Sequence, residues 1–238
     1  MISKPRFSLL FALLAMPSLA QAQEILYDAS GGLKISQFGG WTVFPTAIES
    51  FSAGTTLIDT SSINNIQGGF SRLDQPLNRT TGYTLGFTMK VDSEVHDGVN
   101  GPNRAGISVI ALSSDLLGIE LGFWSDRVWA QSGPSFTKAE EALFNTTTAL
   151  TGYSLKISGT TYQLSANGTP LLSGPLRDYS SAGTVYTTPN FLFFGDNTTS
   201  ARGSFRTSQV TMSVAPEPAS LGLLSLGLLG GLWYRRKS

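Results

Sequence analysis

Two tryptophans and several polar residues fall on neighbouring predicted strands. Because successive side chains of a strand point to opposite faces, the stretch Gly118 to Trp124 places Glu120 and Trp124 together, opposite its apolar residues. Aromatic rings beside fixed polar groups hold sugars by stacking on the sugar ring and bonding its hydroxyls. The pattern predicts a glycan-binding surface made of Arg104, Glu120, Trp124, Trp129 and Gln131. The alternative is that both tryptophans are core side chains and that Arg104 and Glu120 form a structural ion pair.

An oxygen-rich segment surrounds His96, the one histidine of the chain. Asp92, Asp97 and Asn100 could hold Ca²⁺, a hard cation that prefers oxygen ligands. The spacing lacks the order of an EF-hand loop, and Asp, Asn, Gly and Pro also form ordinary turns. A polar loop with a solvent-exposed His96 and no cofactor is therefore the competing interpretation.

Few residues are suited to catalysis. The chain has no cysteine, and His96 has no Gly-x-Ser-x-Gly elbow to serve. A retaining glycosidase needs two carboxylates about 5 Å apart, and Glu120 has no acidic partner on its strand. We therefore expect no catalytic residue.

The composition favours many strands joined by turns. Only 13% of residues are charged, whereas 26 are glycine, and 16 Lys and Arg balance 16 Asp and Glu, which argues against a nucleic-acid partner. Alternating apolar runs predict strands at Gly82 to Val91, Arg104 to Leu112, Gly118 to Trp124, Arg127 to Gln131, Gly152 to Ser158, Thr161 to Ala166, Asn190 to Gly195 and Phe205 to Val214.

Local signals add three hairpins and one helix. The hairpins turn at Ser125-Asp126, Gly159-Thr160 and Asn167-Gly168. The helix covers Phe136 to Phe144, with Thr137 and Glu140 forming a capping box.

The N-terminus reads as a secretory signal. Lys4 and Arg6 precede an apolar stretch that ends in Ala20-Gln21-Ala22, so residues 1–22 are expected to be removed by the secretion machinery and signal peptidase. The apolar stretch is too short to span about 30 Å of hydrocarbon, which argues against an uncleaved anchor.

The C-terminus combines three features in order. Pro216, Glu217 and Pro218 precede an apolar run over residues 219–234, followed by Arg235, Arg236 and Lys237. A helix of this length spans about 24 Å, which suits transient membrane anchoring. The order of motif, helix and basic tail resembles the PEP-CTERM sorting signal, here residues 214–238. That resemblance implies a Gram-negative bacterium and an exosortase-type membrane protease as partner; the alternative is an ordinary single-pass anchor.

Between the two ends lies one predicted domain, residues 23–213. The eleven cations and fifteen anions of residues 23–215 give it a net charge of −4. The order of strands and turn phrases resembles the concanavalin A-like jelly roll, in its laminin-G-like branch, as seen in RAGISVIALSSDLLGIELGFWSDRVWAQ, YSLKISGTTYQLSANGTPLLSGPLRDYS and FLFFGDNTTSARGSFRTSQVTM. The resemblance implies an all-β fold of two antiparallel sheets.

These expectations combine into one main function and two alternatives. The main one is an exported protein of the cell surface or a biofilm matrix of exopolysaccharide, whose non-catalytic sandwich serves glycan binding or adhesion. The alternatives are a glycan-active hydrolase or lyase on the same fold, since the jelly roll that the chain resembles hosts lectins, adhesion modules, glycanases and lyases alike, and a purely structural matrix protein.

Overall fold

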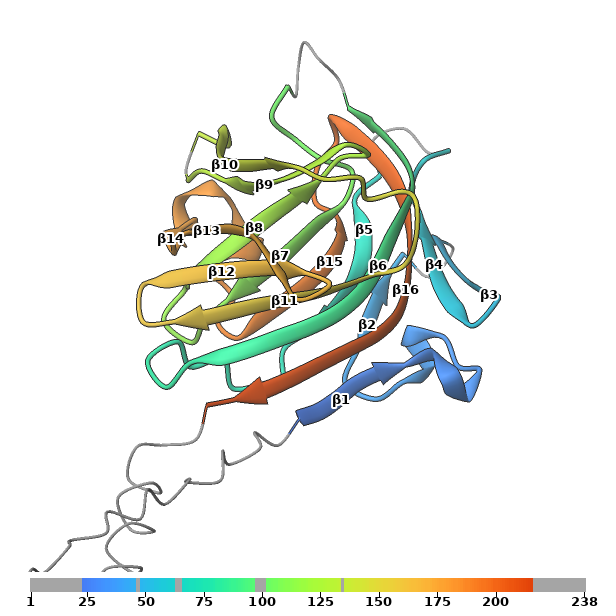
Figure 1. The fold of residues 1–238 in the computed structure, drawn as a ribbon, viewed down its shortest axis with the longest axis horizontal. Helices are drawn as coiled ribbons and strands as arrows, with labels where there is room; N and C mark the ends of the chain where they lie inside the picture. The colour runs from blue at the N-terminus through green and yellow to red at the C-terminus, as the bar shows by residue number, and fades with distance from the viewer. Residues whose placement is uncertain (1–22, 46–47, 63–65, 97–101, 134, 216–238) are drawn as a thin grey trace, which may run out of the picture.

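Two antiparallel sheets pack face to face in the computed structural model, which describes residues 23–45, 48–62, 66–96, 102–133 and 135–215 (Figure 1). The first sheet has the order β13-β12-β11-β6-β16-β4-β3, and β1 pairs with β16. Its strands are β1 (Gln23–Asp28), β3 (Glu49–Ser52), β4 (Thr55–Asp59), β6 (Tyr83–His96), β11 (Thr151–Ser158), β12 (Thr161–Ala166), β13 (Thr169–Pro175) and β16 (Ala201–Val214).

The second sheet has the order β10-β9-β8-β7-β15-β5-β2, with β14 paired to β8. Its strands are β2 (Thr42–Phe44), β5 (Gly68–Arg72), β7 (Ser108–Leu112), β8 (Leu117–Phe123), β9 (Arg127–Gln131), β10 (Lys138–Leu143), β14 (Arg177–Asp178) and β15 (Phe191–Asp196). Short 3-10 turns are η1 (Ala29–Gly31), η2 (Ile35–Gln37), η4 (Ser180–Ala182) and η5 (Thr184–Thr187). The expected all-β jelly-roll architecture of two sheets is confirmed.

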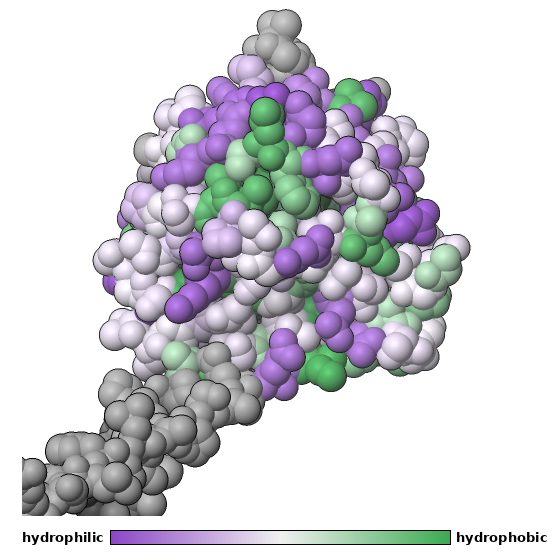
Figure 2. Space-filling model, viewed as in Figure 1, coloured by the Kyte–Doolittle hydropathy of each residue, from purple (hydrophilic) through white to green (hydrophobic). Residues whose placement is uncertain are grey.

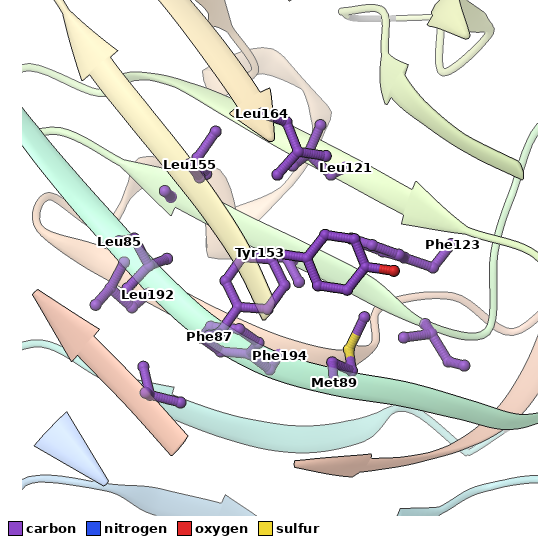
Figure 3. Packing of buried hydrophobic residues seen from close by; sticks show 14 of the residues in the cluster. Leu85, Phe87, Met89, Leu121, Phe123, Tyr153, Leu155, Leu164, Leu192 and Phe194 are labelled. Carbon is purple, nitrogen blue, oxygen red and sulfur yellow. The ribbon is translucent and has the colours of Figure 1, made fainter. Parts of the chain in front are cut away.

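The core lies between the sheets because the strands alternate. In β11, Tyr153, Leu155 and Ile157 are buried, and each residue between them is exposed. Figure 3 shows the inward side chains of β6, β8, β11 and β15 meeting in one layer. Each fully buried Leu or Phe contributes roughly 1.5–3 kcal/mol relative to an exposed one. The predicted inward placement of Ile119, Leu121 and Phe123 is confirmed.

The predicted hairpins are also confirmed. The turns at Ser125-Asp126, Gly159-Thr160 and Asn167-Gly168 join β8 to β9, β11 to β12 and β12 to β13. Asn167 and Gly168 both have positive φ, the backbone that such tight turns require.

The predicted helix over Phe136 to Phe144 is wrong. Lys138–Leu143 forms β10, which pairs with β9 and gives the backbone groups of that strand a partner. Its glutamates alternate in direction: Glu140 meets Arg177, and Glu141 meets Arg127. Tertiary pairing has therefore overridden the local helix signal.

The two ends of the sandwich lie side by side. Gln23 at the start of β1 pairs with Ser213 near the end of β16, and the start of β1 and the end of β16 lie at the same corner of Figure 1. The predicted signal segment, 1–22, and the residues from 216 onward lie outside the described part. Within the described residues, no helix is long and apolar enough to cross a membrane.

Apolar side chains also reach the surface. Figure 2 shows a group of apolar residues in the upper middle of this face and smaller apolar spots elsewhere, among hydrophilic and near-neutral residues. Across the whole described surface, the most exposed large apolar side chains are Leu143, at 76%, and Phe44, at 72%.

Candidate functional site

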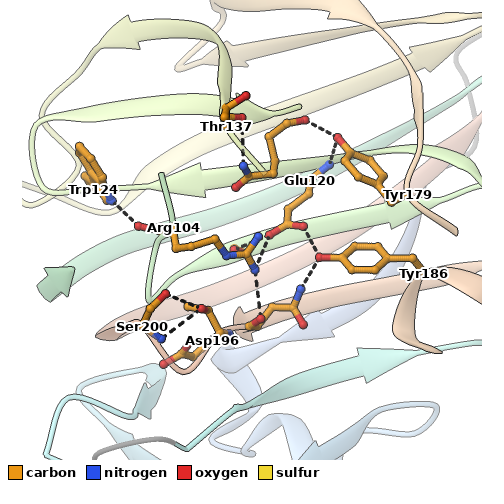
Figure 4. A network of polar contacts seen from close by, with 12 residues as sticks. Arg104, Glu120, Trp124, Thr137, Tyr179, Tyr186, Asp196 and Ser200 are labelled. Atoms are coloured by element: carbon orange, nitrogen blue, oxygen red, sulfur yellow. Dashed lines mark hydrogen bonds and ion pairs between the residues drawn. The ribbon is translucent and has the colours of Figure 1, made fainter. Parts of the chain in front are cut away.

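The outer face of the second sheet carries the polar residues that the sequence singles out. Glu120 points away from the sandwich core, as the alternation of β8 predicts, yet only 1% of it is exposed. The chain after β13 returns across β8, and Tyr179 and Tyr186 from this crossing point at Glu120 (Figure 4). This covering segment, residues 176–188, includes β14, η4 and η5.

Glu120 is held by several groups at once. The Nη2 atom of Arg104 lies 3.5 Å from Oε1 of Glu120, and Ser108 donates a hydrogen bond of 3.2 Å to the same oxygen. Tyr186 donates its hydroxyl to Oε2 at 2.5 Å. Arg104 also donates to the carbonyl oxygen of Asn197 at 3.1 Å, and its guanidinium lies 4.3 Å from the ring centre of Phe136. The carboxylate is therefore neutralised and enclosed.

The two tyrosines remain protonated donors in this network. Burial raises the pKa of Tyr186, and the Glu120 carboxylate raises it further. Burial likewise raises the pKa of Tyr179, which donates to the carbonyl oxygen of Gln131 at 2.6 Å. The side chain of Gln131 donates to the carbonyl oxygen of Thr137 at 3.0 Å. The network joins β8, β9 and the covering segment.

Trp124 and Trp129 are packed side chains. Their exposed fractions are 8% and 0%, and together with Ala105 they form a small cluster of their own. The indole of Trp129 lies over Gly122, where a Cβ atom would come within 2.5 Å of the ring. Trp124 donates its indole hydrogen to the carbonyl oxygen of Arg104 at 3.0 Å.

Both faces of the Trp124 ring are occupied. The imidazole of His96 stacks on it at 3.8 Å between ring centres, and Nζ of Lys138 lies 4.1 Å from the same centre. Two groups this close to one ring centre lie on its two opposite faces. As the alternative expects, both tryptophans are buried and Arg104 pairs with Glu120, but the tryptophans lie in a cluster outside the sandwich core. Sugar binding by these residues stays a prediction.

The structure also changes the interpretation of His96. This residue ends β6, which runs five residues beyond the predicted strand end at Val91, and two-thirds of its side chain is covered. Its Nδ1 lies 3.0 Å from Oε2 of Glu94, a carboxylate whose pKa is raised by burial. The expectation of a solvent-exposed His96 in a loop is therefore wrong.

The proposed Ca²⁺ ligands are only partly described. Asp92 lies in β6 and pairs with Arg206 at 2.6 Å and with Lys90 at 3.2 Å, so cations already neutralise its carboxylate. Asp97 and Asn100 lie outside the described residues. Within the described part of the chain, no cluster of three His, Cys, Asp or Glu residues could hold a metal ion.

Asp196 is a buried carboxyl close to this network. It ends β15, and it accepts hydrogen bonds from the hydroxyl of Thr60 at 2.9 Å and from the backbone N–H of Thr198 at 3.1 Å. Burial raises its pKa to about 7.

The sequence pattern revealed neither the burial of Asp196 nor the roles of Tyr179 and Tyr186. One available signal was the break in alternation after Pro175, where a covering segment replaces the next strand.

Comparisons with known proteins identify the sorting motif and the fold of the sandwich. Residues 214–237 match the family profile described as the PEP-CTERM protein-sorting motif. A search among curated proteins found no match. This motif implies export, membrane anchoring before processing, and an exosortase as the processing enzyme.

Solved structures share the fold of the sandwich. A carbohydrate esterase from the Shiga toxin-encoding bacteriophage phi24B is 12% identical, covers 82% of this chain and 100% of its own, and has a TM-score of 0.55. The exoplasmic domain of VIP36, solved with Ca²⁺ and mannose, is 11% identical over 82% and 91% of the two chains, with a TM-score of 0.52. The Crh5 transglycosylase is 10% identical over 82% and 84%, with a TM-score of 0.51.

Identities this low show the fold alone. The chain therefore joins a jelly-roll β-sandwich to a PEP-CTERM protein-sorting motif, which begins at the last residue of β16.

Proposed function

We propose that this chain is an exported polysaccharide-associating protein whose sandwich binds without catalysis. In this proposal signal peptidase removes residues 1–22, and the apolar segment after Pro218 holds the chain transiently in the inner membrane of a Gram-negative cell. An exosortase then cuts within residues 214–238. The released protein, with its sandwich over residues 23–213, joins the cell surface or an exopolysaccharide matrix.

One observation carries this proposal. The sandwich begins with β1 at Gln23 and ends with β16 at Val214, so it fills the interval between the predicted signal segment and the sorting motif. In this proposal the sandwich carries out the function of the exported protein. Solved structures that share this fold include a carbohydrate esterase and a VIP36 domain with bound mannose, which supports carbohydrate as the ligand class.

The burial of Glu120 supports binding over cleavage. A glycosidase holds its carboxylates where substrate and water reach them, and its acid and base are usually two separate carboxyl groups. Here Glu120 is 1% exposed, paired with Arg104 and bonded by Tyr186. A carboxylate enclosed in this way does not meet a glycosidic bond.

A binding and end-group assay tests the proposal. The processed protein, purified from the cell surface, is passed over immobilised polysaccharides while the eluate is assayed for reducing and unsaturated ends. We expect retention without new ends. New ends would favour the hydrolase or lyase alternative, and neither retention nor new ends would favour a purely structural protein.

A further inference from the structure

The outer face of the first sheet carries three shallow depressions that connect. The first has a volume of about 250 Å³ and lies over β16, β6 and β11. The second, of about 210 Å³, shares Thr84 with the first, and the third, of about 180 Å³, shares Lys156 and Ser158 with the second. Together they form a polar track across β16, β6, β11 and β12.

Two glycines account for the depth of the first depression. Gly86 on β6 stands between Ser154 on β11 and Thr211 on β16, and Gly152 on β11 stands opposite Thr88. Both residues lie on the outward face of the sheet, where any side chain would occupy the depression. A strand interior normally disfavours glycine, and it often marks a place where a ligand approaches the backbone closely.

The lining contains many hydroxyl and amide side chains and no acidic group. Hydroxyl and amide side chains dominate the first depression, and Gln23 donates to Thr211 at 2.9 Å along its edge. Within the described residues, the hydroxyls of Thr84, Ser154 and Ser213 have no hydrogen-bond partner. They are therefore available to an external ligand.

One cation stands in the track. Lys156 lines the second and third depressions, its side chain is exposed, and no carboxylate in the described part of the chain pairs with it. No aspartate or glutamate lines any of the three depressions. This is notable in a domain whose net charge is −4.

We propose that this track binds an extended polysaccharide strand that bears carboxylate groups. The inference rests on the proposed function and assigns it a surface and a ligand class. Hydroxyls and amides bond sugar hydroxyls along the strand, and Lys156 attracts a carboxylate of the polymer. Because the track is open and shallow, each contact is weak, and a polymer gains affinity by engaging several repeats or several copies of the protein.

Gly152→Val tests the track with little risk to the fold. A Cβ atom at this position meets only Oδ1 of Asn167, at 3.7 Å, which is an ordinary contact, and β-branched residues favour strands. The new side chain stands on the floor of the first depression. Gly39→Val is the matched control, since a Cβ atom there has nothing within 4 Å and Gly39 lies outside the track.

Binding is measured on the processed protein by titration with polyuronate oligosaccharides and, separately, with neutral glucan oligosaccharides. We expect Gly152→Val to weaken polyuronate binding about tenfold or more, the loss typical of blocking a contact surface. Lys156→Gln should weaken polyuronate binding and make its affinity less dependent on salt concentration. Lys156→Arg should keep the wild-type affinity and the wild-type salt dependence. Gly39→Val should bind like the wild type.

The outcomes separate this inference from the proposed function. If the wild type binds no polysaccharide, the proposed function fails and the track fails with it. If the wild type binds and Gly152→Val binds equally well, the track is wrong and the proposed function stands. If the wild type binds neutral glucan but not polyuronate, and Gly152→Val loses the binding of neutral glucan, the track is right and the carboxylate-bearing ligand is wrong. If Lys138→Gln loses polyuronate binding and the track variants keep it, the binding site lies beside Trp124 and not in the track.

Discussion

The imidazole ring of His96 lies parallel to the indole ring of Trp124, with ring centres 3.8 Å apart and planes 5° apart. One residue ends β6 of the first sheet, and the other follows β8 of the second. The stack therefore joins the two sheets at their rim. Lys138 from β10 closes the second face of the indole. Trp124 is therefore packed between a residue of the first sheet and a residue of the second.

Trp124→Ala should be strongly destabilising. The substitution removes a side chain that is 8% exposed and leaves a cavity beneath His96 and Lys138. We expect a loss of about 3–5 kcal/mol in the free energy of unfolding, measured by denaturant titration. Leu143→Ala is the control, because its side chain is 76% exposed and should change stability by less than about 0.5 kcal/mol. A near-neutral Trp124→Ala would restore the open-surface interpretation.

Glu120→Ala should expose the cost of an unpaired buried cation. Arg104 would lose its carboxylate partner, and the hydroxyl of Tyr186 would lose its acceptor. Breaking one side of a buried pair costs about 3–5 kcal/mol, whereas replacing both partners by apolar residues costs less. Arg104→Leu combined with Glu120→Leu should therefore unfold at higher denaturant than Glu120→Ala. Equal midpoints would show that the pair is not coupled.

Asp196 should make stability fall as the pH rises from about 4 to 7. Its pKa is raised by burial to about 7 in the folded state, above the unfolded value of about 3.9, so the folded state binds the extra proton in this window. The slope is at most about 1.4 kcal/mol per pH unit from this group. Thermal melts of wild type and Asp196→Asn at pH 5 and pH 7.5 measure it. The variant should show a smaller loss between the two, and an unchanged pH dependence would refute the assignment.

Removing divalent cations should leave stability unchanged. Asp92 is already neutralised by Arg206 and Lys90, so it gains little from Ca²⁺. A ligand that binds only the folded state raises the melting temperature. A Ca²⁺ site would therefore lower the melting temperature when EDTA removes the ion. Melting curves with EDTA and with added CaCl₂ decide this. A clear difference would revive the site that includes Asp97 and Asn100.

Alternation made much of the sandwich predictable. Ile119, Leu121 and Phe123 face the core because a strand with one buried face repeats every two residues, and this pattern is visible in the sequence. The pattern equally indicated that Glu120 and Trp124 point to the other face. It could not show that a distant segment covers that face.

The covering segment and β10 escaped prediction for different reasons. Tyr179 and Tyr186 sit in or beside short 3-10 turns, which have no apolar period to reveal where they pack. Lys138–Leu143 consists of Lys, Ala, Glu and Leu, all good helix formers, and becomes a strand only because β9 offers an edge to pair with. The position of the covering segment depends on its contact with β8, and the strand conformation of β10 depends on its pairing with β9.

The polysaccharide-associating sandwich is tested most directly by hydrogen–deuterium exchange of the processed protein with and without a saturating polyuronate. We expect slower exchange in Thr151–Ser158 and in the part of β6 that pairs with it, because the track lies over these strands. Exchange over Arg127–Leu143, beside Trp124, should stay the same. Protection confined to residues 127–143 would place the polysaccharide outside the track, and no protection in any strand would show that the sandwich does not bind it.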